Sequence, residues 1–362
     1  MSLTVQVQKR YGNFYLDVDF SADGGQALAL LGASGCGKSV TLKCIAGINK
    51  PDRGRIVLDG QVLFDSEEGI NLSPQRRRIG FLFQNYALFP NMTVERNIAV
   101  CLNRLDKRRR ARTAELLALL HLEGLEKLYP RQLSGGQQQR AALARILAAE
   151  PRALLLDEPF SALDSYLKWQ LEGELREVLD RFPGPVIWVS HDQGEACRNC
   201  PHVCVLDGGK SAPVRAMAEL MANPVTVGAA RLSGCKNFAP VRPGPAEGMV
   251  EVPDWGLILR AASSWQEGVT TLGLRANRLH PAAPGEANAF PCQVVRAAED
   301  MASMVLTLRP EGAGPSAPLL RMELAKEIWM ALPDQSRFPA AVRPEDLMLL
   351  RQEEIGCTQP RF

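Results

Sequence analysis

One segment near the amino terminus constrains the fold of this chain more than any other. Residues 32–39 have the sequence GASGCGKS and fit the pattern G-x-x-x-x-G-K-[ST] without a mismatch. In this pattern backbone N–H groups surround nucleotide phosphates, the lysine reaches the β- and γ-phosphates, and the last hydroxyl ligates Mg²⁺. The candidate residues for this phosphate site are Gly32, Ala33, Ser34, Gly35, Cys36, Gly37, Lys38 and Ser39.

The sequence on both sides of this segment favours a phosphate site over its alternative, an ordinary Gly-rich turn. The apolar residues 27–31 are typical of a buried strand, and residues 39–45 begin a helical run. A helix that follows a strand and a glycine loop presents unpaired N–H groups and its positive dipole end to an anion. We therefore predict that the chain binds a nucleoside triphosphate together with Mg²⁺.

The order of the remaining segments predicts an α/β fold. Short apolar runs, as expected of buried parallel strands, occur at residues 80–83, 153–156 and 185–190. The pattern between residues 85 and 150 is helical, and residues 166–179 form a further helical stretch. Strand, helix and strand in this order indicate a parallel sheet that is interrupted by a helical insertion.

Proline and glycine cluster beyond about residue 230, and the segments become short and strand-like. This change predicts an all-β module after the first domain. The expected domains are residues 1–230, with a core at about 1–84 and 151–230 and a helical subdomain at about 85–150, and residues 231–362. Within the second domain, residues 274–279 resemble residues 342–347, either through duplication or by chance.

Two carboxylates stand at the end of the predicted strand 153–156. In an open parallel sheet the carboxyl ends of the strands line the ligand crevice. Asp157 is therefore expected to hold Mg²⁺ with Ser39, and Glu158 to orient and deprotonate an attacking water. The alternative, a helix start or a surface pair of acids, is disfavoured by the phosphate loop upstream.

A second motif, LSGGQ, occupies residues 133–137. Taken alone, Ser134 followed by Gln137 fits a helix capping box. Together with the phosphate loop, however, LSGGQ resembles the signature of ATP-binding-cassette (ABC) ATPases. The other motifs of that family follow in the same order: Gln84 is similar to the Q-loop, Asp164 in SALD to the D-loop, and His191 to the switch histidine. The resemblance covers about residues 1–230.

The resemblance implies a shared catalytic site in a homodimer that sandwiches two ATP molecules. Each ATP would lie between residues 32–39 of one subunit and the signature of the other, which consists of Ser134, Gly135, Gly136 and Gln137. Glu158 would be the general base and His191 would contact the γ-phosphate. Gln84 would contact Mg²⁺ and the water, and Asp164 would bridge the subunits.

Two further ATP contacts follow from the same resemblance. The backbone N–H of Val40 would reach a phosphate, although the family more often has Thr at this position. The base would stack on an aromatic residue of the first strand region, for which Tyr11 is the best match and Phe14 the alternative. A core aromatic remains possible at either position.

The chain resembles the separate ATPase subunits of bacterial importers rather than exporters. It has no apolar run near the length of a membrane span, and its β-rich tail resembles oligobinding-type regulatory domains. Residues 9–14, 37–40 and 80–84 look most like the molybdate and sulfate branch, with molybdate preferred over sulfate. This implies transmembrane permease subunits as partners, a solute-binding protein indirectly, and a peripheral location at the cytoplasmic face of the cell membrane.

Other functions fit the sequence less well. A net charge of +2 gives no reason to expect nucleic-acid binding. An ABC ATPase that acts on DNA would need a long coiled coil, and one that acts on ribosomes would need a second cassette. A regulator that does not hydrolyse ATP would not need both Glu158 and His191. The basic cluster 76–78 is expected on a solvated face.

Four residues close together in the sequence are possible zinc ligands. They are Cys197, Cys200, His202 and Cys204. Their close spacing would cramp a zinc site, so buried, reduced cysteines are the preferred interpretation.

Overall fold

The computed structural model describes residues 1–102, 107–161 and 165–351, and the chain divides into two compact units, Met1–Ala218 and Glu219–Phe362. The sequence had placed the boundary after residue 230. The structure places it earlier because α9 (Val227–Leu232) packs against strands β17 (Val269–Leu274) and β23 (Met348–Arg351) of the second unit. None of the helices in the described ranges has the length and the apolar composition needed to cross a bilayer.

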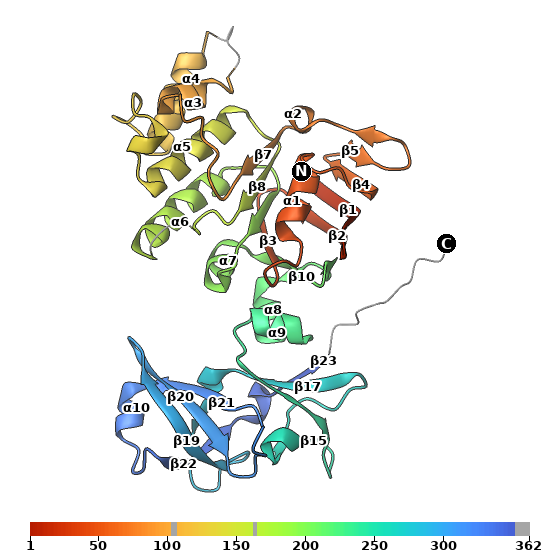
Figure 1. Ribbon diagram of the computed structural model, residues 1–362, viewed down its shortest axis with the longest axis vertical. Helices are drawn as coiled ribbons and strands as arrows, with labels where there is room; N and C mark the ends of the chain where they lie inside the picture. Colours follow the sequence, from red (N-terminus) through yellow and green to blue (C-terminus); the bar gives the residue numbers. More distant parts are fainter. Residues whose placement is uncertain (103–106, 162–164, 352–362) are drawn as a thin grey trace. The chain divides into compact units, whose positions relative to one another are not determined.

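A twelve-stranded sheet forms the centre of the first unit (Figure 1). Its strand order along the main path is β6 (Ile70–Asn71), β5 (Gln61–Asp65), β4 (Arg53–Leu58), β1 (Ser2–Tyr11), β2 (Phe14–Asp23), β11 (Lys210–Ser211), β10 (His202–Asp207), β3 (Ala27–Leu31), β9 (Val186–Val189), β8 (Ala153–Asp157) and β7 (Ile79–Leu82), with β12 (Arg215–Ala216) paired to β10. The strands from β10 to β7 run parallel, whereas β1, β2, β4, β5 and β6 pair antiparallel. The predicted α/β fold is thereby confirmed.

Burial explains why the parallel strands read as continuous apolar runs. Every residue of β3, β8 and β9 is buried, since these strands lie inside the sheet and helices cover them. The antiparallel strand β1 instead alternates, with Leu3, Val5 and Val7 inside the core. This difference in pattern separates the two halves of the sheet.

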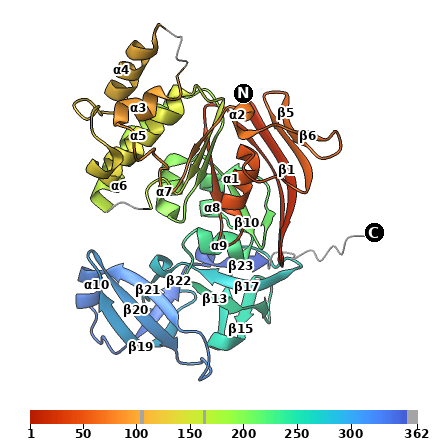
Figure 2. The same ribbon diagram turned by 45° about the horizontal axis from the view of Figure 1, so that its top comes forward.

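Helices surround the sheet, and three of them form a separate lobe. The helices of the first unit are α1 (Lys38–Ala46), α2 (Pro74–Arg77), α3 (Val94–Ala99), α4 (Arg109–Leu119), α5 (Gly135–Ala148), α6 (Ser165–Asp180), α7 (Gln193–Asn199) and, at the boundary, α8 (Met217–Ala222). Figures 1 and 2 show α3, α4 and α5 packed together beyond the β7 edge, on the far side of that edge from α1. This lobe corresponds to the predicted helical insertion.

The second unit consists mainly of strands around its own core. Its strands form three sheets: β13 (Asn237–Pro240), β17 and β23; β14 (Arg242–Pro243), β15 (Met249–Val252) and β16 (Leu257–Arg260); and β18 (Leu279–Pro281), β22 (Arg337–Val342), β19 (Phe290–Glu299), β20 (Ser303–Pro310) and β21 (Leu320–Ala325). Its short helix α10 (Lys326–Met330) follows β21. Trp255, Leu272 and Leu306 are among the fully buried residues of its core.

The two similar hexapeptides of the second unit fold alike and face each other. Each joins two strands through a 3₁₀ turn, Ala276–Arg278 in one and Pro344–Asp346 in the other. Leu279 pairs with Val342 and Gly273 with Met348, so one antiparallel register runs through both. Arg278 and Asp346, at the same position of each hexapeptide, form an ion pair at 3.4 Å. The resemblance in sequence therefore corresponds to a local two-fold relation.

Candidate functional site

Four neighbouring parallel strands end at the same edge of the first unit's sheet, and each leads into one of the predicted motifs. β3 leads to Gly32, β8 ends at Asp157, β9 leads to His191 and β7 leads to Gln84. Leu30 and Asp157 both pair with Val189, so the ends of β3, β9 and β8 are level. The topology alone therefore gathers motifs that are far apart in the sequence.

The loop between β3 and α1 requires glycine at two positions. Gly37 caps the start of α1 with φ 108°, and a Cβ atom there would lie 2.6 Å from Leu16 Cδ1. A Cβ atom on Gly32 would lie 2.2 Å from the carbonyl oxygen of Leu206. The loop borders a cavity of about 760 Å³, which is large enough for a nucleotide.

The lysine of the loop lies folded back over it. Lys38 Nζ donates to the carbonyl oxygens of Gly32 at 2.8 Å and Ala33 at 3.0 Å, and it lies 3.8 Å from Cys36 Sγ. Cys36 is buried beneath the loop, whereas Ser34 and Gly35 are exposed and line the cavity. The ammonium group is thus held at the centre of the loop, where phosphate oxygens would be cradled.

Ser39 lines the cavity, and Asp157, at the end of β8, is the hydrogen-bond partner of its hydroxyl. Ser39 Oγ donates to Asp157 Oδ1 at 3.1 Å. Burial raises the pKa of Asp157 above its ordinary value, against the opposing effect of the hydrogen bond from Ser39. A buried carboxylate beside a hydroxyl, with its charge only partly compensated, fits a small divalent cation such as Mg²⁺.

Glu158 lines the cavity and contacts two other residues that the sequence had singled out. Its carboxylate oxygen Oε2 accepts a hydrogen bond from Gln84 Nε2 at 3.2 Å and lies 3.5 Å from His191 Nδ1. The backbone of Glu158 has φ 49°, a left-handed conformation that is uncommon for a residue with a side chain. Such strain recurs at functional sites. The structure therefore brings Gln84, Glu158 and His191 together.

Aromatic and basic side chains complete the lining of the cavity. Tyr11, which is 44% exposed, and Phe14 both lie there, beside Val40 at the start of α1. Lys43 and Asn49 line the cavity as well and were missed in the sequence. Lys43 follows Ser39 by four residues, so the helical repeat placed it on the same face of α1.

The signature residues lie apart from this cavity in the same chain. Ser134 and Gln137 cap α5 reciprocally: Gln137 N donates to Ser134 Oγ at 3.3 Å, and Ser134 N donates to Gln137 Oε1 at 2.9 Å. Gly136 packs where a Cβ atom would lie 2.8 Å from Leu171. As far as described residues form the lining, it includes none of residues 134–137. The signature thus presents a capped helix N-terminus, with Ser134 exposed to solvent.

Two further predictions made from the sequence concern Asp164 and the cysteine cluster that begins at Cys197. Asp164 lies outside the described residues. Cys200 and Cys204 are buried, and burial raises the pKa of the Cys204 thiol to about 12 and that of Cys200 further still. Within the described residues, no group of His, Cys, Asp and Glu is arranged to hold a metal ion.

Comparison with known proteins places this site in a family. Residues 15–161 match the family model described as ABC transporter. A sulfate/thiosulfate import ATP-binding protein of Synechococcus elongatus is 45% identical, over 61% of this chain and 64% of the relative. A probable sulfate/thiosulfate import ATP-binding protein of Chlorella vulgaris is 42% identical, over 65% of this chain and 100% of the relative. A molybdenum import ATP-binding protein of Paramagnetospirillum magneticum is 40% identical, over 61% of each.

A solved structure shares the fold. The ATP-binding cassette MJ0796, determined as a dimer in a post-hydrolysis state with ADP and phosphate, is 30% identical with a TM-score of 0.51, over 60% of this chain and 99% of its own. The chain spans less than two thirds of the Synechococcus and Paramagnetospirillum relatives, but it spans the whole of the Chlorella relative. The predicted ABC ATPase fold is therefore confirmed, and the chain belongs to the ABC transporter family, among its ATP-binding proteins.

Proposed function

We propose that this chain hydrolyses ATP as a closed homodimer and thereby powers the import of an oxyanion through a membrane permease. The observation that carries the proposal is the contact of Gln84 and His191 with Glu158, which lines the cavity that the phosphate loop borders. Phosphoryl transfer depends mostly on positioning and charge stabilisation, which such a site supplies. The ATP-binding relatives described above, named for import, support the coupling to transport.

Each residue has a role that its position allows. Lys38 and the loop N–H groups neutralise the phosphates, while Tyr11, with Phe14 as the alternative, stacks on the base. Ser39 and Asp157 would hold Mg²⁺ with the help of Gln84, and the cation would supply charge neutralisation at the phosphates. Glu158 accepts the proton of the attacking water, and His191 contacts the γ-phosphate.

The dimer is proposed because the site is incomplete in one chain. The exposed N-terminus of α5, with Ser134, Gly135, Gly136 and Gln137, is an anion-binding element that does not line its own cavity. A second copy would place that element over the ATP, with Asp164 bridging the two subunits. Hydrolysis then waits for closure, which is how transport can be coupled to it.

The transported solute is proposed as molybdate, with sulfate or thiosulfate as the alternative. Residues 9–14, 37–40 and 80–84 favour this branch of importers. Relatives named for sulfate/thiosulfate support the alternative, and the molybdenum import protein supports the first choice. In this role the chain is held at the cytoplasmic face of the membrane by permease subunits, and it meets the solute-binding protein only indirectly. Stimulation of ATP hydrolysis by molybdate, tungstate or sulfate in the reconstituted complex distinguishes the solutes.

The dimer is tested by trapping it. Glu158→Gln keeps the hydrogen-bonding shape of the side chain but removes the base, so ATP and Mg²⁺ should drive the variant into a stable dimer, measured by size-exclusion chromatography with light scattering. Glu177→Gln, an exposed change on α6, is the matched control and should hydrolyse ATP without accumulating a dimer.

A second substitution in the Glu158→Gln protein separates the role of the signature from that of the phosphate loop. Ser134→Arg should abolish the dimer while ATP binding persists, because the signature acts on the partner's ATP. Lys38→Ala should greatly weaken both ATP binding and dimer formation. A Glu158→Gln protein that remains monomeric at saturating ATP and Mg²⁺ would contradict the closed dimer.

A further inference from the structure

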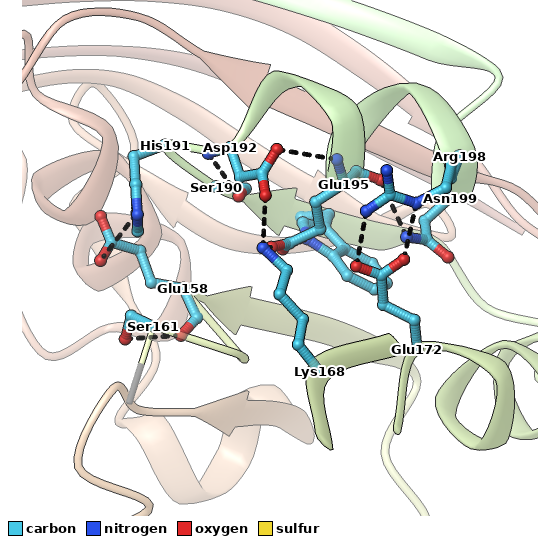
Figure 3. Close-up of polar contacts among 11 residues, drawn as sticks. Glu158, Ser161, Lys168, Glu172, Ser190, His191, Asp192, Glu195, Arg198 and Asn199 are labelled. Atoms are coloured by element: carbon cyan, nitrogen blue, oxygen red, sulfur yellow. Dashed lines mark hydrogen bonds and ion pairs between the residues drawn. The ribbon is translucent and has the colours of Figure 1, made fainter. Parts of the chain in front are cut away.

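The residues on either side of His191 are held by polar contacts, whereas His191 itself is exposed (Figure 3). Asp192 N donates to Ser190 Oγ at 3.0 Å. Asp192 Oδ1 accepts a hydrogen bond from Glu195 N at 3.1 Å and so caps α7. The His191 side chain is 65% exposed, with Glu158 as its carboxylate neighbour. Its placement therefore depends on how firmly its neighbours in the chain are fixed.

A lysine from another helix fixes these neighbours. Lys168 Nζ, on α6, lies 2.5 Å from Asp192 Oδ2 and 2.8 Å from Glu195 Oε2. Glu195 is 3% exposed, and its other oxygen accepts from the indole N–H of Trp188 in β9 at 2.7 Å. Charge-assisted hydrogen bonds of this kind are about twice as strong as neutral ones.

The protonation of both groups supports this tether. Burial lowers the pKa of Lys168, but its hydrogen bonds to Asp192 and Glu195 outweigh this and leave the pKa above its ordinary value. Burial raises the pKa of Asp192, but the hydrogen bond from Lys168 outweighs this and leaves that pKa below its ordinary value. Both groups are therefore charged at neutral pH.

A second ion pair between the same two helices serves as a comparison. Arg198 on α7 donates to Glu172 on α6 through Nε and a terminal nitrogen, each at 2.8 Å. Figure 3 shows this pair farther from His191 than the Lys168 cluster. Arg198 and Glu172 already join α6 to α7. The contact of Lys168 with Asp192 is therefore not needed to hold the two helices together, and what it fixes is the residue next to His191.

We infer that Lys168 is a positioning residue that sets the placement of His191 through Asp192. The inference rests on the proposed ATP hydrolysis and deepens it. Helix α6 begins at Ser165, directly after Asp164, the residue that resembles the bridge between subunits. Lys168 thereby connects α6 to the segment that carries His191.

Kinetics of four single variants and one double variant test this inference. Lys168→Gln should lower kcat by about tenfold or more and leave KM for ATP within about twofold, since no residue of the phosphate loop is touched. Lys168→Arg keeps the charge and should restore much of the rate. Arg198→Gln, the matched control, should lower the Tm but leave kcat unchanged. In a His191→Ala background, measured in single turnovers, Lys168→Gln should cause no further loss, because its effect acts through His191.

A second measurement does not depend on hydrolysis. The imidazole proton resonance of His191, assigned by its loss in His191→Ala, should move in nucleotide-free Lys168→Gln and stay in place in Arg198→Gln. An unmoved resonance, or an equal rate loss in the presence and absence of His191, overturns the inference. A wild-type protein without ATPase activity would refute the proposed function instead, and the resonance alone would then decide the role of Lys168.

Discussion

Asp157 shows a single residue kept in a form that suits a ligand rather than the stability of the free protein. Its carboxylate is buried at the end of β8, and burial is the main reason that its pKa is raised. A raised pKa means that the folded state disfavours the ionised carboxylate, so ionised Asp157 lowers the free energy of unfolding at pH values above its folded-state pKa. This loss of stability becomes smaller as the pH falls through the folded-state pKa and the carboxylate is protonated. A bound cation would remove it.

Asp157→Asn tests this conflict. The amide oxygen can still accept the hydrogen bond of Ser39 without a buried charge, so the nucleotide-free variant should be at least as stable as wild type at pH 7.5 in urea unfolding. Its advantage should shrink as the pH is lowered toward 4. Magnesium-dependent ATP binding should weaken by about tenfold or more. The exposed Asp180→Asn should change neither quantity, and a large loss of stability in Asp157→Asn would contradict the interpretation.

Residues with a fixed motif were predictable, whereas those that act through tertiary contacts were not. Lys38, Ser39 and Asp157 follow from short patterns because phosphate and Mg²⁺ chemistry restricts both residue type and spacing. Arg77 was expected on a solvated face, but that expectation was wrong, since the side chain is 1% exposed. Lys168 has no local signal either, because its acceptors lie more than twenty residues away along the chain.

At the scale of elements, Arg77 explains how the phosphate-loop helix ends. Its guanidinium donates to the carbonyl oxygens of Cys44 and Ile45 in the last turn of α1, each at 2.8 Å, and to Leu72 O at 2.9 Å. A positive charge at a helix C-terminus also matches the helix dipole. Gly47 ends α1 with φ 78°, and a Cβ atom there would lie 2.5 Å from Arg77 Nε. Arg77 thus fastens α1 to α2, which leads into β7.

Arg77→Met should therefore destabilise the protein strongly. It removes the guanidinium donor from the buried carbonyl oxygen of Ile45 and the part-buried one of Leu72, whereas Cys44 O keeps a hydrogen bond from Gly47 N. An unsatisfied buried polar group costs about 1–3 kcal/mol, so we expect a loss of about 2 kcal/mol or more in the free energy of unfolding. Urea unfolding followed by circular dichroism measures it. The neighbouring Arg76 is exposed, and Arg76→Met should stay within about 0.5 kcal/mol of wild type. Equal losses in the two variants would show that Arg77 is not the cap.

The elements themselves were predicted well where local sequence decides them. The strand expected at residues 27–31 is β3 with those bounds, and Ser134 does begin α5 through the capping box that the sequence also allowed. Helix α5 extends earlier than its apolar run, because its first turn is made of glycine and glutamine rather than apolar residues. Capping, not hydrophobicity, sets that start.

For the whole molecule, the sequence predicted the class of the fold but neither its strand order nor the point of division between units. The pairing of β10 with β3 joins segments at opposite ends of the first unit, and no local pattern predicts such a contact. The division after Ala218 was missed because the composition changes only after α9, while α9 belongs by its contacts to the second unit. Arg275 donates to Met221 O and to Ser233 Oγ, at 3.0 Å for the latter, and so secures this helical segment.

The division predicts how the second unit behaves as a separate protein. A fragment of residues 219–351 keeps α9, whose Ala230 is fully buried with Cys235 and Leu350, whereas a fragment of residues 231–351 exposes that cluster and deprives Arg275 of the Met221 carbonyl. We expect the shorter fragment to be less stable by about 2 kcal/mol or more. Arg275→Met should weaken the longer fragment more than the shorter one, since one acceptor is already lost there. Equal midpoints of thermal unfolding for the two fragments would show that α9 does not stabilise the second unit. The boundary between the units would then lie at residue 230, as the sequence predicted.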